Sequence, residues 1–142
     1  MMEKGKYVEE VNDEVTEFIT SHTGYVSFKN GWGEDISSLT VRHRRSNNPN
    51  EEEIKAVYNI PSGKEVGVMN FTYETGAGSS FDYWWIKFIT NSGKEYQIKD
   101  NFYCSVSSND DGNVKLRIDG ADKKLYVTFS NSSSCQVSIS AS

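Results

Sequence analysis

The chain has 142 residues and a formal net charge of −5 at pH 7. This length suits one domain whose core is large enough to need no obligatory metal or disulfide framework, and the acidic balance argues against wrapping duplex nucleic acid. No apolar run approaches the roughly 20 residues that span a bilayer, and the N-terminal segment lacks the apolar core of a signal peptide.

Residues 1–23 are predicted to form an N-terminal arm. From Val8 to Thr20 the apolar residues recur near helical spacing, and the acidic residues of the first half suit the positive end of a helix dipole. Thr16 and several other β-branched residues weaken helix formation. A short amphipathic helix, a frayed arm and an extra edge strand therefore all stay open.

From Gly24 onward the hydrophobic period changes to two, and turn signals recur about every eight to twelve residues, which is typical of an antiparallel sandwich or barrel. The predicted strands are Tyr25–Lys29, Leu39–His43, Ile54–Ile60, Val66–Tyr73, Tyr83–Thr90, Glu95–Ile98, Phe102–Val106, Val114–Ile118, Leu125–Phe129 and Cys135–Ile139. Glycine-containing turns at 61–64, 91–94, 110–113 and 119–122 are predicted to close hairpins. Residues 24–142 are thus predicted to form one all-β domain, a single antiparallel β-sandwich.

Alternation along the aromatic segment Asp-Tyr-Trp-Trp-Ile-Lys-Phe predicts which of its side chains are buried. Trp84, Ile86 and Phe88 share one face, which we assign to the core. Tyr83 and Trp85 lie on the opposite face. Trp85 is therefore the better candidate for an exposed, functional tryptophan.

Both cysteines are predicted to point inward, since alternation places Cys104 with Phe102 and Val106, and Cys135 with Val137. Buried free thiols are the favoured interpretation, because cysteine behaves as a small hydrophobe. A disulfide between neighbouring strands is the alternative and would suit an oxidising compartment. The spacing lacks the paired ligands of a zinc site.

The order of several short motifs is recognisable: Val-Ser-Phe-Lys-Asn, Leu-Thr-Val-Arg-His, Tyr-Glu-Thr-Gly, Asp-Tyr-Trp-Trp-Ile-Lys-Phe and Ser-Ser-Ser-Cys. In this order the chain from Tyr25 to Ile139 resembles the small family named for nematode proteins raised in long-lived insulin-receptor mutants. The resemblance implies a compact β-sandwich and an intracellular, stress-associated role rather than a defined activity.

More loosely, the layout is similar to that of aegerolysins, actinoporins and other small β-sandwich cytolysins, whose aromatic loops meet membrane lipid. This similarity implies lipid recognition, and pore formation would require a homo-oligomer or a second protein component. The chain departs from the layout by carrying the Val8–Thr20 segment and by lacking a clear match around the aegerolysin lipid-contact loops.

Four aromatic residues near loop ends, Trp32, Tyr73, Tyr83 and Trp85, are candidates for contact with a lipid headgroup or a sugar ring, because each combines an apolar body with a polar edge. Core packing is the alternative, above all for Tyr73 and Tyr83. Trp32 lies in a turn-rich stretch, so Trp32 and Trp85 are the stronger candidates.

Three of the four arginines of the chain, Arg42, Arg44 and Arg45, precede a polar loop and the acidic run 51–53. Guanidinium groups bind phosphate or carboxylate oxygens in a bidentate fork, so these arginines are candidates for a lipid phosphate or an acidic partner. The alternative is a solvated loop with its own Arg–Glu pairs, each of which contributes about 0–1 kcal/mol.

Catalytic, metal and cofactor sites are not expected. His22 and His43 are the only histidines, and neither lies in a recognised catalytic motif. The turn aspartates lack the ligand spacing of an EF-hand. The leading interpretation is a non-enzymatic protein that binds membrane lipid, whether cytoplasmic or released without a classical signal, with no nucleic acid as partner. A soluble glycan- or protein-binding module is the alternative.

Overall fold

The structure is a computed structural model that describes residues 19–142. Residues 1–18, with most of the predicted arm and of the Val8–Thr20 segment, lie outside the described residues. The described part is all β, and it contains no helix long and apolar enough to cross a membrane. The predicted all-β sandwich is confirmed.

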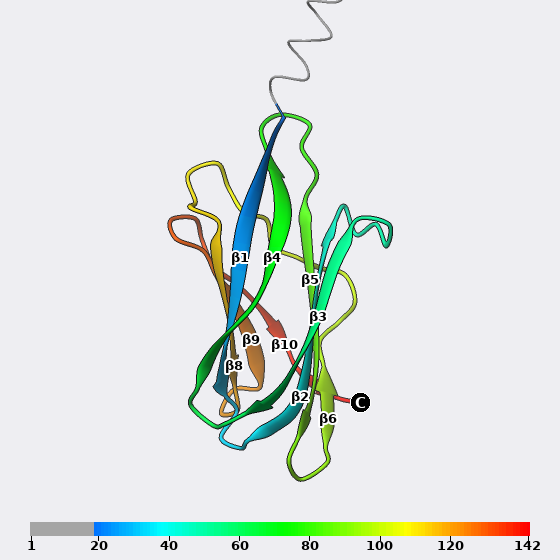
Figure 1. Cartoon of the computed structure of the whole chain (residues 1–142), viewed down its shortest axis with the longest axis vertical. Coiled ribbons are helices and arrows are strands. Elements are labelled where there is room, and N and C mark those ends of the chain that lie inside the picture. The colour runs from blue at the N-terminus through cyan, green and yellow to red at the C-terminus, as the bar shows by residue number, and fades with distance from the viewer. Residues whose placement is uncertain (1–18) are drawn as a thin grey trace, which may run out of the picture.

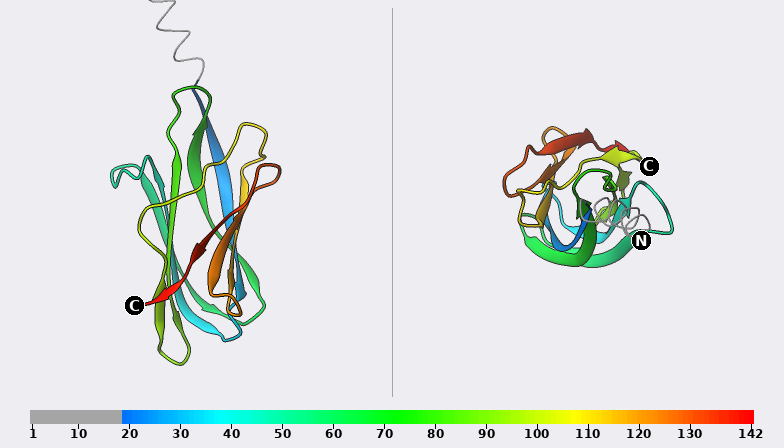
Figure 2. Two further views of the ribbon diagram at one scale, coloured as in Figure 1. Left: turned by 180° about the vertical axis from the view of Figure 1, so that it is seen from behind. Right: turned by 90° about the horizontal axis from the view of Figure 1, so that it is seen from above.

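Two sheets pack face to face (Figures 1 and 2). Sheet A has the strand order β10 (Cys135–Ser138), β9 (Lys124–Thr128), β8 (Asn113–Asp119), β1 (Thr20–Gly31) and β4 (Glu65–Thr75). Sheet B has the order β11 (Ser140–Ala141), β6 (Glu95–Gln97), β5 (Asp82–Thr90), β2 (Ile36–Arg45) and β3 (Glu52–Ile60), and β7 (Phe102–Tyr103) pairs with β5. The pairing is antiparallel throughout, except that β1 and β8 are parallel.

Each of the ten predicted strands overlaps one of the strands β1 to β10. Strand β1 begins at Thr20, inside the segment assigned to the arm, because its first residues pair with the end of β4 as far as Thr75. Strand β11 was not predicted, since two residues carry no periodicity. The predicted existence of the strands is thus confirmed, while their ends differ by a few residues.

Two of the four predicted hairpins are wrong. The turns at 91–94 and 119–122 do join paired neighbours, β5 to β6 and β8 to β9. The turn at 61–64 instead carries the chain from β3 in sheet B to β4 in sheet A, and residues 110–113 lead from sheet B into β8 of sheet A. A glycine turn reverses the chain locally but does not determine which sheet the next strand joins.

The core lies between the sheets and is built from the inward residues of both. Trp84, Ile86 and Phe88 are fully buried, whereas Tyr83 and Trp85 are half-buried on the outer face of sheet B, as alternation predicts. From sheet A, the fully buried side chains include Val26, Phe28, Leu116, Ile118, Leu125 and Val127. The four connections β2–β3, β4–β5, β7–β8 and β9–β10 gather at the upper end of the sandwich in Figure 1.

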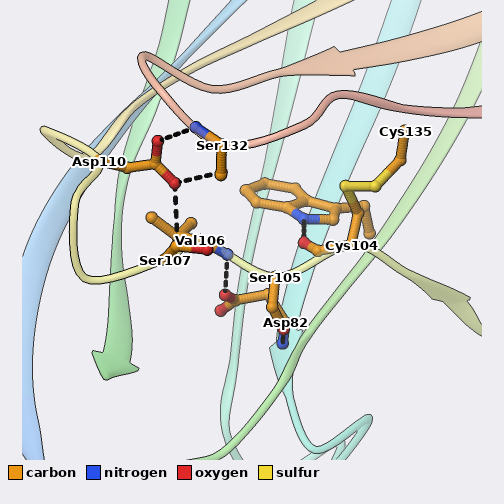
Figure 3. The surroundings of a disulfide bond; sticks show 9 residues. Asp82, Cys104, Ser105, Val106, Ser107, Asp110, Ser132 and Cys135 are labelled. Atoms are coloured by element: carbon orange, nitrogen blue, oxygen red, sulfur yellow. Dashed lines mark hydrogen bonds between the residues drawn. A yellow bond between two sulfur atoms is a disulfide. The ribbon is translucent and has the colours of Figure 1, made fainter. Parts of the chain in front are cut away.

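The predicted free thiols are wrong, because Cys104 and Cys135 form a disulfide with a Cα–Cα distance of 6.1 Å (Figure 3). Cys104 follows β7 of sheet B and Cys135 begins β10 of sheet A, so the bond joins the two layers. Alternation correctly pointed both side chains inward. Which inward positions face one another across the sandwich depends on the strand order, which alternation does not contain.

Candidate functional site

Two of the four aromatic candidates, Tyr73 and Trp32, do not form a common surface with the other candidates. Tyr73 is in the core with 4% of its surface exposed, stacked on His22 at 4.9 Å, so core packing holds at this position. Trp32 directly follows β1 and is half-buried, with its ring 4.8 Å from that of Tyr96. A Cβ on Gly120 would lie 2.0 Å from the Trp32 carbonyl oxygen, so glycine permits this close approach of the β8–β9 turn.

Four of the predicted residues do come together, on the outer face of sheet B. Arg42 pairs in register with Trp85 and Arg44 with Tyr83. The Arg42 guanidinium carbon lies 5.0 Å from the centre of the Trp85 ring, a cation–π geometry. Arg45 is directed elsewhere and donates to the Thr72 carbonyl of β4.

The arginines are already engaged by the protein's own carboxylates. Arg42 donates to the carboxylate and to the backbone carbonyl of Asp100. The hydrogen bond to the carboxylate is the main cause that lowers the pKa of Asp100. Arg44 Nε lies 2.8 Å from Glu52, and Arg45 lies 3.5 Å from Glu51 and 3.7 Å from Glu53. The internal Arg–Glu pairs of the alternative interpretation are therefore present, and an added phosphate would have to displace them.

Two exposed aromatic residues that were not singled out as candidates extend this face. The Phe81 ring lies 5.3 Å from the Tyr103 ring, and the Tyr103 ring lies 5.8 Å from the Tyr83 ring, both edge to face. Phe81 is 54% exposed and Tyr103 is 48% exposed. We call Phe81, Tyr103, Tyr83 and Trp85 the aromatic strip. The same alternation that places Cys104 inward places Tyr103 outward, so that signal was present in the sequence.

A cleft of about 260 Å³, the rim cleft, opens beside the exposed end of this strip. Its walls come from the end of β4 with the β4–β5 connection, and from β7 with the segment after it, and comprise residues 74–76, 79–81, 103 and 105–108. Phe81 and Tyr103 supply rings, Glu74 a carboxylate, and Thr75 with several serines supply hydroxyl groups that both donate and accept hydrogen bonds.

Local hydrogen bonds shape the wall formed by the β4–β5 connection. The Ser80 N–H donates to the Glu74 carboxylate at 2.9 Å, which bends the connection back on itself. Gly76 and Gly78 have φ values of 105° and 83°, a region that glycine adopts without the penalty of a side chain. The Gly-Ala-Gly-Ser-Ser sequence therefore specifies the turn that presents Phe81.

Asp82 fixes the opposite wall from below (Figure 3). Its carbonyl accepts from the Cys104 N–H at 3.0 Å, its N–H donates to the Ser105 hydroxyl at 2.9 Å, and its carboxylate accepts from the Val106 N–H at 2.9 Å. The disulfide anchors the same segment at Cys104. Residues 104–106 are thus held at three consecutive positions, through two backbone N–H groups and the Ser105 hydroxyl, before any ligand arrives.

A second aspartate fastens the β7–β8 connection to the β9–β10 connection (Figure 3). Asp110 accepts hydrogen bonds from the Ser107 and Asn131 N–H groups and from both the N–H and the hydroxyl of Ser132. Burial opposes ionisation, but the bonds from Ser132, Ser107 and Asn131 outweigh it and lower the pKa of Asp110 to about 2. The carboxylate is therefore ionised at neutral pH and clamps the two loops.

Beneath the cleft lies a charged cluster that the sequence analysis did not anticipate. His43 is fully buried against the rings of Phe71 and Trp84, each 4.7 Å away. Its Nδ1 lies 2.7 Å from Glu53 Oε1 and its Nε2 lies 2.7 Å from Asp82 Oδ1. The alternation that places Leu39 and Val41 inward also places His43 inward, but the partners come from β3 and β5.

His43 carries a positive charge in this arrangement, because carboxylates only accept hydrogen bonds and both ring nitrogens face one. Burial by itself lowers the pKa of His43, but the hydrogen bonds to Asp82 and Glu53 outweigh it and raise the pKa. Burial likewise raises the pKa of Glu53, while the bonds from His43 and the Thr72 N–H lower it overall. With no exposed surface, His43 ties strand β2 to strands β3 and β5 through these two hydrogen bonds.

These shifts predict a pH optimum of stability. Because the pKa of His43 is higher in the folded than in the unfolded protein, protonation of His43 stabilises the fold. This contribution is complete below pH 6.5, and it is lost as the pH rises through the pKa of His43 in the folded protein. Because the pKa of Glu53 is lower in the folded protein, ionisation of Glu53 stabilises the fold above pH 4.5. This contribution is lost as the pH falls through the pKa of Glu53 in the folded protein. We expect the urea midpoint, measured from about pH 3 to about pH 9, to be highest between these two limits. A midpoint that climbs steadily above pH 6.5 would contradict the assignment of a charged His43.

No protein-family model and no curated protein matches this chain. Among residues 19–142, no three His, Cys, Asp or Glu side chains are placed to hold a metal ion together. Function is therefore inferred from the chemistry of the rim cleft and the aromatic strip.

Proposed function

We propose that the protein is a non-enzymatic binding module that takes a neutral saccharide in the rim cleft. The observation that carries this proposal is the pair of exposed rings, Phe81 and Tyr103, set edge to face at 5.3 Å on the wall of a cleft whose other lining residues are mainly serine and threonine. A sugar ring presents an apolar C–H face, which suits an aromatic side chain, and an edge of hydroxyl groups, which suits serine, threonine and carboxylate partners.

The charges near the cleft favour a neutral ligand over an anionic one. Glu74 is the charged residue of the lining, and it is negative. The arginines of the neighbouring face are paired with Asp100, Glu51, Glu52 and Glu53. A phosphate or carboxylate ligand would meet a negative charge in the cleft and no uncommitted guanidinium beside it.

The aromatic strip offers further contacts to a longer chain. Tyr83 follows Tyr103 along the outer face of sheet B, and Trp85 lies on the same face two residues further along β5. Successive sugar units that leave the cleft would pass over these rings. Longer oligosaccharides should accordingly bind more tightly than monosaccharides.

Co-sedimentation with insoluble cellulose, chitin and β-1,3-glucan tests this function. We expect the protein to pellet with at least one polymer, and we expect Tyr103→Ala and Phe81→Ala each to weaken that binding about tenfold, which corresponds to about 1.4 kcal/mol. Tyr58→Ala is the matched control, since Tyr58 is an aromatic residue of sheet B that is 65% exposed and does not line the cleft. Failure to pellet with any polymer, or an equal loss in Tyr58→Ala, would contradict the proposal.

Membrane lipid is a second candidate, supported by the exposed apolar side chains Phe81, Tyr103 and Ile54 at and beside the aromatic strip. On this alternative, the protein co-pellets with phosphatidylcholine vesicles and its tryptophan emission shifts to the blue, and Trp85→Ala weakens both effects. Free hexasaccharides would not compete. Trp32→Ala is expected to leave vesicle binding unchanged, because Trp32 packs against Phe88 and Tyr96 and lies outside the lining of the rim cleft.

A further inference from the structure

The outer face of sheet A is hollowed by a depression of about 300 Å³, larger than the rim cleft. Its floor and walls come from three adjacent strands and the loops above them. The main contributors are Tyr25 and Ser27 of β1, Asn113 and Lys115 of β8, Thr128 of β9, and Ser130. We call this feature the sheet A depression.

Tyr25 forms an aromatic wall of this depression. It alternates with the fully buried Val26 and therefore points out of the sandwich, where it is 43% exposed. On the neighbouring strand β4, a Cβ added to Gly67 would lie 2.1 Å from the Tyr25 hydroxyl oxygen. The bare glycine thus leaves room for the phenol to lie across β4. Gly67 has no positive φ, so this space, and not backbone conformation, is what the glycine provides.

Apart from the nearly buried Val114 and Phe129, the other groups that line the depression are polar, and their charges are nearly balanced. Lys115 Nζ lies 3.3 Å from Glu65, so its charge is paired on the protein. The carboxylate of Asp111 accepts from the Asn113 N–H at 2.9 Å, and the Asp111 N–H donates to the Ser130 hydroxyl at 2.8 Å. Hydroxyl, amide and carboxylate groups beside one half-exposed ring resemble the lining of the rim cleft.

We propose that the sheet A depression is a second saccharide-binding site, in which a neutral sugar unit lies against Tyr25 and bonds with the polar groups around Ser27 and Asn113. The site is built from its own residues and stands whether or not the rim cleft binds a ligand. With both sites occupied, one protein molecule would hold two sugar chains or two stretches of one chain.

The connection between β7 and β8 gives both sites the same preorganised support. Its residues 105–108 line the rim cleft, and Asp111 lines the sheet A depression. Asp110, which lies between these two parts of the connection, ties the connection to the β9–β10 connection. Because the walls are fixed before binding, little ordering entropy opposes ligand capture at either site.

Amide chemical shifts of the ¹⁵N-labelled protein, titrated with soluble hexasaccharides of β-1,4-glucose, β-1,4-N-acetylglucosamine and β-1,3-glucose, test the second site. We expect saturable shifts at Ser27, Asn113 and Ser130 with at least one of them. Tyr25→Ala should remove these shifts, while Tyr103→Ala should leave them in place.

Gly67→Ala is a second, more selective variant, because it keeps every lining residue and displaces the Tyr25 hydroxyl. We expect it to weaken binding at the depression severalfold while the rest of the spectrum is preserved. Shifts confined to the amides of Ser79, Ser80 and Ser105 would overturn the second site and leave the proposed function standing. Shifts at the sheet A depression alone would overturn the proposed function of the rim cleft and leave the second site standing. The absence of shifts with all three sugars would overturn both proposals.

Discussion

Replacing His43 with leucine is expected to lower the free energy of unfolding by about 3–5 kcal/mol, the usual cost of removing one partner of a buried ion pair. The substitution removes the cation that separates Asp82, which has no exposed surface, from the partly buried Glu53. Both carboxylates would then face an apolar side chain and would lose the 2.7 Å hydrogen bonds that they accept from the imidazole ring. Urea unfolding followed by tryptophan fluorescence measures the loss.

Arg44→Leu is the matched control for this experiment. Arg44 is the next residue of the same strand but lies on the outer face, where its pair with Glu52 is partly exposed to solvent. Its loss is expected to change the free energy of unfolding by only about 0–1 kcal/mol. If His43→Leu proved no more damaging than Arg44→Leu, the buried cluster would not be a significant source of stability.

Removing the disulfide with the double substitution Cys104→Ala/Cys135→Ala is expected to lower the free energy of unfolding by about 3–4 kcal/mol. The bond joins residues 31 apart, and the chain-entropy account gives a loss of this size for a loop of that length. We also expect weaker saccharide binding, because residues 105–108 form a wall of the rim cleft and directly follow Cys104, which would lose its covalent anchor.

Reduction of the unmodified protein supplies the control for the disulfide. Dithiothreitol should lower the urea midpoint of the unmodified protein to about that of the double variant and leave the variant unchanged. Thiol titration of the unmodified protein in urea without reductant should detect no free cysteine. Two reactive thiols in that titration would show that the bond does not form, and the predicted loss of stability would then be absent.

The candidate site could be predicted in part from local pattern. A period of two is enough to place Tyr83 and Trp85 on one face of a strand, and a similar pattern places Arg42 and Arg44 on one face of another. Nothing in either pattern shows that these two faces are neighbours, or that Phe81 and Tyr103 continue them. Those contacts depend on β2 and β7 both pairing with β5, from distant parts of the chain.

The arginines illustrate the same limit. Their number and spacing suggested a site for an anionic ligand, and the acidic run 51–53 suggested internal pairing. Only the register of β2 against β3, which sets Arg44 opposite Glu52 and His43 opposite Glu53, decides between these interpretations. A carboxylate within hydrogen-bond distance satisfies a guanidinium far better than one that is merely close in sequence.

The amino-acid pattern was enough to predict the all-β class, the existence of strands β1 to β10 and the inward or outward direction of most of their side chains. These properties follow from alternation and turn chemistry within a few residues, and so they can be read locally. The tertiary structure alone decided the crossings between sheets, the Cys104–Cys135 bond, the partners of His43 and the two clefts. Each of these joins segments far apart in the chain, and such contacts depend on the order of the strands within the two sheets, which no local pattern encodes.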